Sequence, residues 1–272
     1  MNLNRHRGRT RKRTGCVSLS WLVLLVGLAA APGTAQAQGG RGAGPAPSAR
    51  VVAPKDVTGY WVSVVAEHWH LRMLVPPKGE FAMLPLNAEA RRIANAWDPA
   101  QEPTGDEQCR SYGAAAIMRV PGRLHVHWVD DNTLQMDIDS GTQTRVFHFG
   151  SAAPATQAPQ RQGHSVAEWE GIPAAELRAR TTSSQEDVRG GLKVMTTRMR
   201  AGFLRKNGVP YSANATLEEH YDRFTEPNGD DWHVVDSIVR DPQYLTEPYV
   251  TSVAFKKIPD ASGWDPTPCQ AN

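Results

Sequence analysis

The sequence predicts an all-β protein with one short helix, built as an antiparallel β-barrel or, alternatively, as a β-sandwich. Short runs rich in Val, Ile, Thr and aromatic residues recur along the chain and are separated by turn residues. In one run, Leu134, Met136 and Ile138 alternate with polar side chains, which places apolar groups on one face. Ser140-Gly141 follows this run as a hairpin turn. We therefore expect a meander of strands over 57–67, 68–75, 115–120, 123–129, 133–139, 142–150, 164–170, 192–199, 215–224, 232–240 and 249–257.

Residues 87–97 break this strand pattern. The segment is rich in Ala, Asn87 stands at a natural N-cap, and Pro99 follows its end. Ala90, Ile93 and Trp97 fall on one face at helical spacing. We expect a short helix that lies against the sheet or across one of its openings.

The first 37 residues are typical of a cleavable secretory signal peptide. Six Arg and Lys residues between positions 5 and 13 form a basic segment without acidic residues. The uncharged apolar run 17–31 is shorter than the roughly 20 residues that span a membrane, so we expect no permanent anchor. Ala35-Gln36-Ala37 offers small side chains to a signal peptidase, which predicts cleavage after Ala37 and a periplasmic or secreted protein.

Cleavage would change the formal net charge from +2 to about −4, since 24 Lys and Arg would remain against 28 Asp and Glu. Such a chain lacks the basic footprint of nucleic-acid binding, and we exclude that function. Residues 38–54 are rich in Gly, Ala and Pro and predict a flexible leader. We assign 55–272 to a single β domain and interpret the low-complexity stretch 151–162 as a surface loop, a division into two domains there being the alternative.

Two cysteines, Cys109 and Cys269, would remain after cleavage. In an oxidising compartment a disulfide between them would close a loop of about 160 residues and contribute about 4 to 5 kcal/mol in the chain-entropy model. We predict this disulfide, with two buried free thiols as the alternative.

Thr58-Gly59-Tyr60-Trp61 resembles the Gly-x-Trp signature of the lipocalins and the wider calycin-like barrels. The resemblance implies that Trp61 closes the base of a barrel. A broader resemblance, to a large group of exported, uncharacterised bacterial β proteins, rests on the segments 109–121, 163–170, 219–224 and 239–244. The insertion between Glu170 and Leu192 departs from that group's pattern. The resemblance supports a barrel and export, and it names no catalytic residue.

Two histidine pairs are the clearest candidates for a metal site. His68 and His70, like His125 and His127, are two residues apart, which on a strand places both imidazoles on one face. Zinc, copper or iron would accept these ligands, with Asp137, Asp139 or His148 completing the shell. The alternative, which we favour, is that the histidines line a solvated face and that the protein has no cofactor.

Charged and aromatic residues inside apolar runs are candidates for a ligand site. In a barrel some of them would face the interior, where they would orient a ligand or exchange protons. The charged ones are Glu67, Arg72, Arg119, Arg145, Glu168, Arg198, Glu219, Asp222 and Arg223. For ligand binding we select Trp69, Arg72, Trp128 and Arg145.

Our first functional hypothesis is a binding protein that holds a hydrophobic or amphipathic small molecule in a barrel lumen. The alternative is a cofactor-free or metal-dependent barrel enzyme of the hydratase, isomerase or lyase type. Its acid-base candidates are Glu67, His70, His127 and Glu168. A structural protein of the cell envelope is a third hypothesis. A serine hydrolase is rejected because Ala167 replaces the second Gly of a Gly-x-Ser-x-Gly turn.

Overall fold

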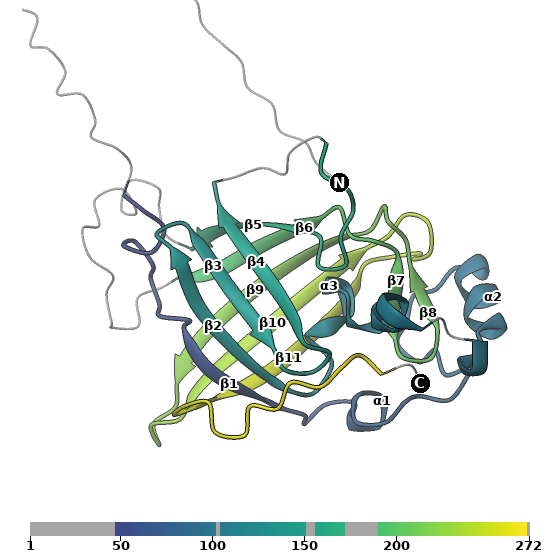
Figure 1. Cartoon of the computed structure of the whole chain (residues 1–272), viewed down its shortest axis with the longest axis horizontal. Coiled ribbons are helices and arrows are strands. Elements are labelled where there is room, and N and C mark those ends of the chain that lie inside the picture. Colours follow the sequence, from purple (N-terminus) through teal and green to yellow (C-terminus); the bar gives the residue numbers. More distant parts are fainter. Residues whose placement is uncertain (1–46, 102–103, 151–155, 172–189, 271–272) are drawn as a thin grey trace, which may run out of the picture. The chain divides into compact units, whose positions relative to one another are not determined.

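The computed structural model describes residues 47–101, 104–150, 156–171 and 190–270. Within these ranges nine strands close into a barrel in the order β1-β11-β10-β9-β6-β5-β4-β3-β2 (Figure 1). The predicted all-β barrel is thus confirmed. The signal segment 1–37 and residues 38–46 of the leader lie outside the described residues. The barrel strands are β1 Gly59–Val64, β2 Arg123–Asp130, β3 Thr133–Ile138, β4 Gln143–Phe149, β5 His164–Glu170, β6 Gly191–Thr197, β9 Thr216–Thr225, β10 Asp231–Arg240 and β11 Tyr249–Ile258.

Eight of the nine neighbouring strand pairs are antiparallel, and β4 and β5 pair in parallel. A parallel pair needs a long connection, and the low-complexity stretch after β4 supplies it. The predicted meander is therefore interrupted at this point. It is interrupted again between β6 and β9, where the chain leaves the barrel to form a small hairpin of β7 Gly202–Arg205 and β8 Val209–Tyr211.

The barrel interior is filled by inward-facing side chains of alternating strand positions. In β3, Leu134, Met136 and Ile138 are buried, as the alternation predicts. Trp61 is also fully buried inside and donates a hydrogen bond to the Val57 carbonyl at 3.2 Å. The interior is therefore mostly a packed apolar core, in which a few polar side chains are enclosed.

The helices and the β7–β8 hairpin gather at one end of the barrel (Figure 1). They are α1 Trp69–Arg72, α2 Ala88–Ala96 and α3 Ala114–Ile117, with 3₁₀ helices η1 Pro99–Gln101 and η2 Gly105–Tyr112. A second apolar cluster joins α2, the hairpin and the adjacent ends of β9, β10 and β11. We call this region the helical end. None of the helices in the described ranges is long and apolar enough to cross a membrane.

The predicted helix over 87–97 is confirmed as α2, and the Asn87 side chain caps it by accepting from the Ala90 amide at 2.9 Å. Two predicted strands were wrong. Residues 68–75 contain α1, which follows His68 in the left-handed conformation with φ of 48°. Residues 115–120 contain α3, because the Ala run after Gly113 favours helix over strand and an apolar run alone does not distinguish the two.

Residues 47–54, expected to belong to a flexible leader, pack against the barrel. Val52 and Ala53 are buried in the main core, and the Ala49 carbonyl accepts from the Trp169 indole at 2.8 Å. The packed part of the chain therefore begins before residue 55. At the other end of the chain, the predicted disulfide joins Cys109 to Cys269, with 5.1 Å between their Cα atoms.

Candidate anion-binding site

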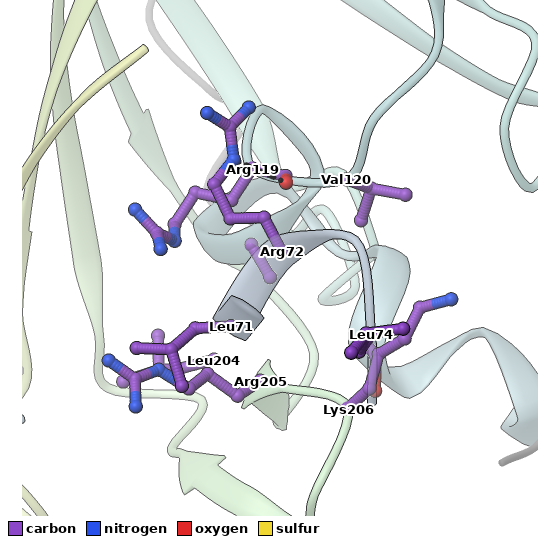
Figure 2. Close-up of a pocket in the computed structure, with 10 residues that line it drawn as sticks. Leu71, Arg72, Leu74, Arg119, Val120, Leu204, Arg205 and Lys206 are labelled. Carbon is purple, nitrogen blue, oxygen red and sulfur yellow. Dashed lines mark hydrogen bonds between the residues drawn. The ribbon is translucent and has the colours of Figure 1, made fainter. Parts of the chain in front are cut away.

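Two adjoining cavities lie at the helical end and share Arg119 and Arg205 as lining residues. The smaller one, of about 30 Å³, is shown in Figure 2 and is lined by α1, the end of α3 and the β7–β8 hairpin. The larger one, of about 190 Å³, opens beside the start of β11. We call the two together the arginine cavity. Besides the two shared arginines, its lining includes Glu67, His68, Leu71, Arg72, Leu74, Met83, Leu204, Lys206, Tyr249 and Val250.

Two arginines of this cavity are buried with unused donors. Arg205 is 5% exposed and donates from Nη2 to the Ala82 carbonyl at 2.7 Å, whereas its Nε and Nη1 have no hydrogen-bond partner among the described residues. Arg72 is 7% exposed and donates from Nε to the Arg119 carbonyl at 3.1 Å, and its Nη2 lacks a partner within the same ranges. Buried polar groups are nearly always paired with protein or with ordered water, so these donors can each donate to a further partner that the described residues do not supply.

The charge around the cavity is strongly positive. Arg72, Arg119 and Arg205 line it, and Glu67, which pairs with Arg72 Nη1, carries the only carboxylate among the described lining residues. Burial lowers the pKa of Arg72, the Glu67 carboxylate opposes this effect, and the neighbouring Arg119 cation lowers the pKa further. Guanidinium groups stay charged in proteins, so Arg205 brings to the cavity a positive charge that no carboxylate of the described residues pairs with. In Figure 2 the guanidinium groups of Arg72, Arg119 and Arg205 lie apart from one another, with that of Arg205 below the other two.

The local sequence explains how Arg205 is held in place. Lys206-Asn207-Gly208 forms the turn between β7 and β8, and Gly208 at its end has the positive φ of 78° that is typical of three-residue hairpin loops. The Asn207 amide donates to the carbonyls of Pro77 and Glu80 at 3.1 and 3.0 Å. These bonds tie the hairpin to the loop before α2. The loop carbonyl of Ala82 in turn fixes the guanidinium of Arg205.

Apolar side chains surround the cavity and remain accessible. Leu71, Leu204 and Tyr249 form buried parts of its lining. Leu74, Met83 and Val250 also line it, yet each is about 60% exposed. Exposed apolar groups gathered around a concave site are typical of a ligand-binding surface.

A second buried cation, Arg145, lies in the barrel interior. It donates from Nη1 and Nη2 to the two carboxylate oxygens of Glu219 at 2.9 and 2.6 Å. Further bonds reach the Tyr221 hydroxyl at 3.2 Å and Thr196 Oγ1 at 3.3 Å. Although burial by itself would lower it, the Glu219 carboxylate holds the pKa of Arg145 above its ordinary value. The charge of this arginine is compensated inside the fold by Glu219, although its Nε also has no hydrogen-bond partner among the described residues.

The structure brings together only part of the predicted site. Glu67, His68, Arg72 and Arg119 all line the arginine cavity. The predicted ligand residue Trp69 is 58% exposed and lines neither part of the cavity. His70 is exposed on α1, so the expected strand geometry of His68 and His70 is replaced by a helical one.

The other predicted residues are spread over the barrel. Trp128 packs against Phe149, with ring centroids 5.6 Å apart. Glu168 is exposed and pairs with Lys193 at 3.4 Å. His125 and His127 lie on β2 and approach Asp137, and His68 and His70 are not part of that group. The acid-base candidates of the enzyme hypothesis thus do not converge on one cavity.

Sequence reasoning missed Arg205, Leu204 and Lys206, because the β7–β8 hairpin was not predicted. The signal was present in Asn207-Gly208 between the apolar residues Leu204 and Val209, a pattern typical of two-residue hairpin turns. This hairpin and α1 line the same cavity although they are about 130 residues apart in the chain, which local patterns do not reveal.

No family model matches the chain, and neither a curated protein nor a solved structure is significantly similar to it.

Proposed function

We propose that the protein is an exported binding protein for a small amphipathic organic anion, which it holds in the arginine cavity. The observation that carries this proposal is the pair of buried guanidinium groups, Arg72 and Arg205, with donors that no described residue accepts. An uncompensated buried charge costs several kcal/mol, so it is retained where a ligand supplies the counter-charge. In the larger part of the cavity, a carboxylate, phosphate or sulfate group would accept the spare N–H groups of Arg205, which lines that part.

The size and lining of the cavity define the rest of the ligand. The larger part, of about 190 Å³, is smaller than the roughly 300 to 1,000 Å³ of sites for drug-sized molecules. Met83, Tyr249 and Val250 line it, which favours an aromatic ring or a short apolar chain attached to the anionic group. The proposed site differs from the lumen expected from the sequence, where fully buried side chains such as Trp61 and Phe147 occupy the interior.

Calorimetric titration of the mature protein tests this proposal with benzoate and its neutral analogue benzyl alcohol. We expect benzoate to bind with a Kd below about 1 mM, which corresponds to about −4 kcal/mol, and benzyl alcohol to bind at least about tenfold more weakly. Arg205→Met should abolish benzoate binding. Arg92→Met is the matched control, because Arg92 is exposed on α2 and pairs with Glu89. Equal binding of the acid and the alcohol, or unchanged binding by Arg205→Met, would refute the proposal.

The alternative function, a barrel enzyme, has one feature in its favour. Glu67 and His68 line the larger part of the cavity, so a carboxylate and an imidazole would stand beside a bound anion. A carboxylate held by a guanidinium is a counter-ion rather than a poised base, and we therefore rank binding first. Turnover of a bound aromatic acid that is lost in both Glu67→Gln and His68→Gln would reverse this ranking.

Export is part of the proposal and is supported by the basic, apolar and small-residue order of the first 37 residues. The disulfide supports it as well, because such bonds persist in oxidising compartments. Amino-terminal sequencing of the protein from a periplasmic fraction should start at Gln38. A cytoplasmic protein that retains Met1 and free thiols would contradict export.

A further inference from the structure

A second candidate site lies on the outer face of the barrel, at β2 and β3. His125 and His127 alternate with the inward-facing Leu124 and Val126, so both imidazoles point outward. Asp137 is the direct cross-strand partner of His125 on β3. One ligand atom from each of His125, His127 and Asp137 lies within 4.8 Å of the other two. Three side chains with metal-ligand chemistry therefore meet on one face.

The Asp137 carboxylate is held in a fixed orientation. Its Oδ1 atom accepts hydrogen bonds from Thr144 Oγ1 at 2.7 Å and from Gln135 Nε2 at 2.9 Å. Its Oδ2 atom faces Nδ1 of His127 at 3.7 Å and Nδ1 of His125 at 4.0 Å. One carboxylate oxygen is thus used for positioning, and the other is directed at two imidazole nitrogens. Hydrogen bonds that orient a ligating carboxylate in this way are typical of metal sites.

The two separations between Asp137 Oδ2 and the histidine Nδ1 atoms are too long for hydrogen bonds, so neither histidine closes on the carboxylate. Elsewhere in the protein His220 closes on Glu170, with 2.7 Å between Nδ1 and Oε1. His127 Nδ1 is buried and has no hydrogen-bond partner in the described part of the chain. Ligands at about 2.0 to 2.2 Å from one metal ion are about 3 to 4 Å apart, a range that includes the two separations between Asp137 Oδ2 and the histidines.

The surroundings leave room for further metal ligands. A cavity of about 300 Å³ adjoins the group and is lined by Tyr60, Thr144 and Trp264 as well as by His125 and Asp137. The Tyr60 ring stacks on the His125 imidazole with 4.1 Å between centroids and an interplanar angle of 5°. This stacking fixes the ring on one side. The open cavity would admit water or an external ligand to the remaining coordination positions.

We propose that His125, His127 and Asp137 bind one divalent first-row transition-metal ion, with coordination positions open toward the Tyr60–Trp264 cavity. Two imidazoles and one carboxylate suit zinc, copper, nickel or iron and do not suit calcium or magnesium. The site is independent of the arginine cavity, so the two proposals can fail separately.

Titration of tag-free mature protein, stripped with a chelator, tests the site with Zn²⁺ and Co²⁺. We expect one Zn²⁺ per chain, and visible d–d absorption of bound Co²⁺. His125→Ala, His127→Ala and Asp137→Asn should each weaken Zn²⁺ binding at least about tenfold and remove the Co²⁺ spectrum. Thr144→Val should weaken Zn²⁺ binding by about 10- to 100-fold, because the substitution removes a hydrogen bond that orients the Asp137 carboxylate.

His220→Ala is the matched control, since it removes a partly exposed histidine that also lies beside a carboxylate. It should bind both ions like the unaltered protein. Thermal unfolding without metal verifies that each variant is folded, and any unfolded variant is replaced by the Gln substitution at the same histidine. A metal concentration of about 10⁻⁴ M is high enough to fill even a weak site. Absence of stoichiometric Zn²⁺ binding at this concentration would overturn the proposal. Equal loss of binding in His220→Ala would do so as well.

Discussion

Arg145 and Arg205 are both buried arginines, yet they differ in the partners that the fold supplies to their guanidinium groups. Arg145 in the barrel interior meets the two carboxylate oxygens of Glu219 and also reaches Tyr221 and Thr196. Arg205 at the helical end reaches one backbone carbonyl, and two of its three nitrogens have no partner in the described ranges. The first cation is neutralised by the fold itself. The second cation has no counter-charge among the described residues, and we infer that a bound ligand provides it.

The two regions also differ in what surrounds the charge. The interior of the barrel is a continuous apolar core, closed to solvent around Arg145. The helical end combines its cations with apolar side chains that stay exposed, such as Met83 and Val250. A matched, enclosed ion pair indicates a structural role, whereas unmatched donors beside an accessible apolar rim indicate recognition.

The largest predicted effect comes from breaking the matched pair. Glu219→Gln keeps the shape of the side chain and removes its charge, and Arg145 cannot neutralise itself by losing a proton. We expect the free energy of unfolding to fall by about 3 to 5 kcal/mol, as for other broken buried ion pairs, measured by urea denaturation. The double variant Arg145→Met with Glu219→Leu should recover most of this loss. A loss below about 1 kcal/mol for Glu219→Gln would show that the pair is not a structural element.

His233 tests whether a charge without a partner in the barrel interior lowers the stability of the fold. Burial lowers the pKa of His233 from 6.5 to about 3, and neither ring nitrogen has a hydrogen-bond partner among the described residues. The unfolded chain therefore binds a proton that the folded one does not, and stability falls as the pH drops from about 6.5 toward 3. The loss should approach about 1.4 kcal/mol per pH unit. His233→Leu should remove this part of the slope between pH 6 and 4, and an identical slope in both proteins would contradict the assignment.

Arg205→Met is the counterpart of the first variant and should have a small effect on folding. It removes a buried charge that no carboxylate of the described residues compensates and loses one hydrogen bond to the Ala82 carbonyl. These effects oppose each other, so we expect the free energy of unfolding to change by less than about 1 kcal/mol without added anions. Saturating benzoate should stabilise the unaltered protein and leave Arg205→Met unchanged. A large loss of stability without ligand would assign Arg205 to the structural class.

Glu67→Gln tests the effect of adding positive charge to the arginine cavity, because it removes the carboxylate that pairs with Arg72. Glu67 is the one carboxylate at the cavity, and its removal adds to the uncompensated positive charge. We expect benzoate to bind about two- to tenfold more tightly, since charge-assisted bonds to a bound anion would strengthen. Calorimetry at constant ionic strength measures this effect. Weaker binding would mean that Glu67 contacts the ligand as a base or positions Arg72.

The barrel was predictable from the sequence because its strands alternate apolar and polar residues, as in Leu134, Met136 and Ile138. The helix α2 was predictable from its Ala-rich pattern and the Asn87 cap. The strand predictions over α1 and α3 were wrong because short apolar segments without a clear period suit either helix or strand. The parallel pairing of β4 with β5 depends on the long connection between them, which has no period of its own.

The candidate site was predictable only in part, for a physical reason. Glu67, Arg72 and Arg119 were recognised as charged residues within apolar runs, which is a local signal. Arg205 joins them from the β7–β8 hairpin, which packs against η2, α2 and α3, and these contacts depend on the tertiary fold. Whether a buried arginine is matched, as Arg145 is by Glu219, likewise depends on strand neighbours distant in sequence. Local sequence patterns therefore indicate candidate charged residues, but only the three-dimensional contacts distinguish Arg145, which pairs with Glu219, from Arg205, which lines the cavity.

A crystal structure of the mature protein with 4-bromobenzoate tests the central claim most directly, because the anomalous signal of bromine locates the ligand. The account predicts a bromine peak in the larger part of the arginine cavity, beside Met83 and Tyr249. The carboxylate should lie within about 3 Å of Nε or Nη1 of Arg205. A ligand in the barrel interior near Arg145, or no ligand at the arginine cavity at saturating concentration, would contradict it.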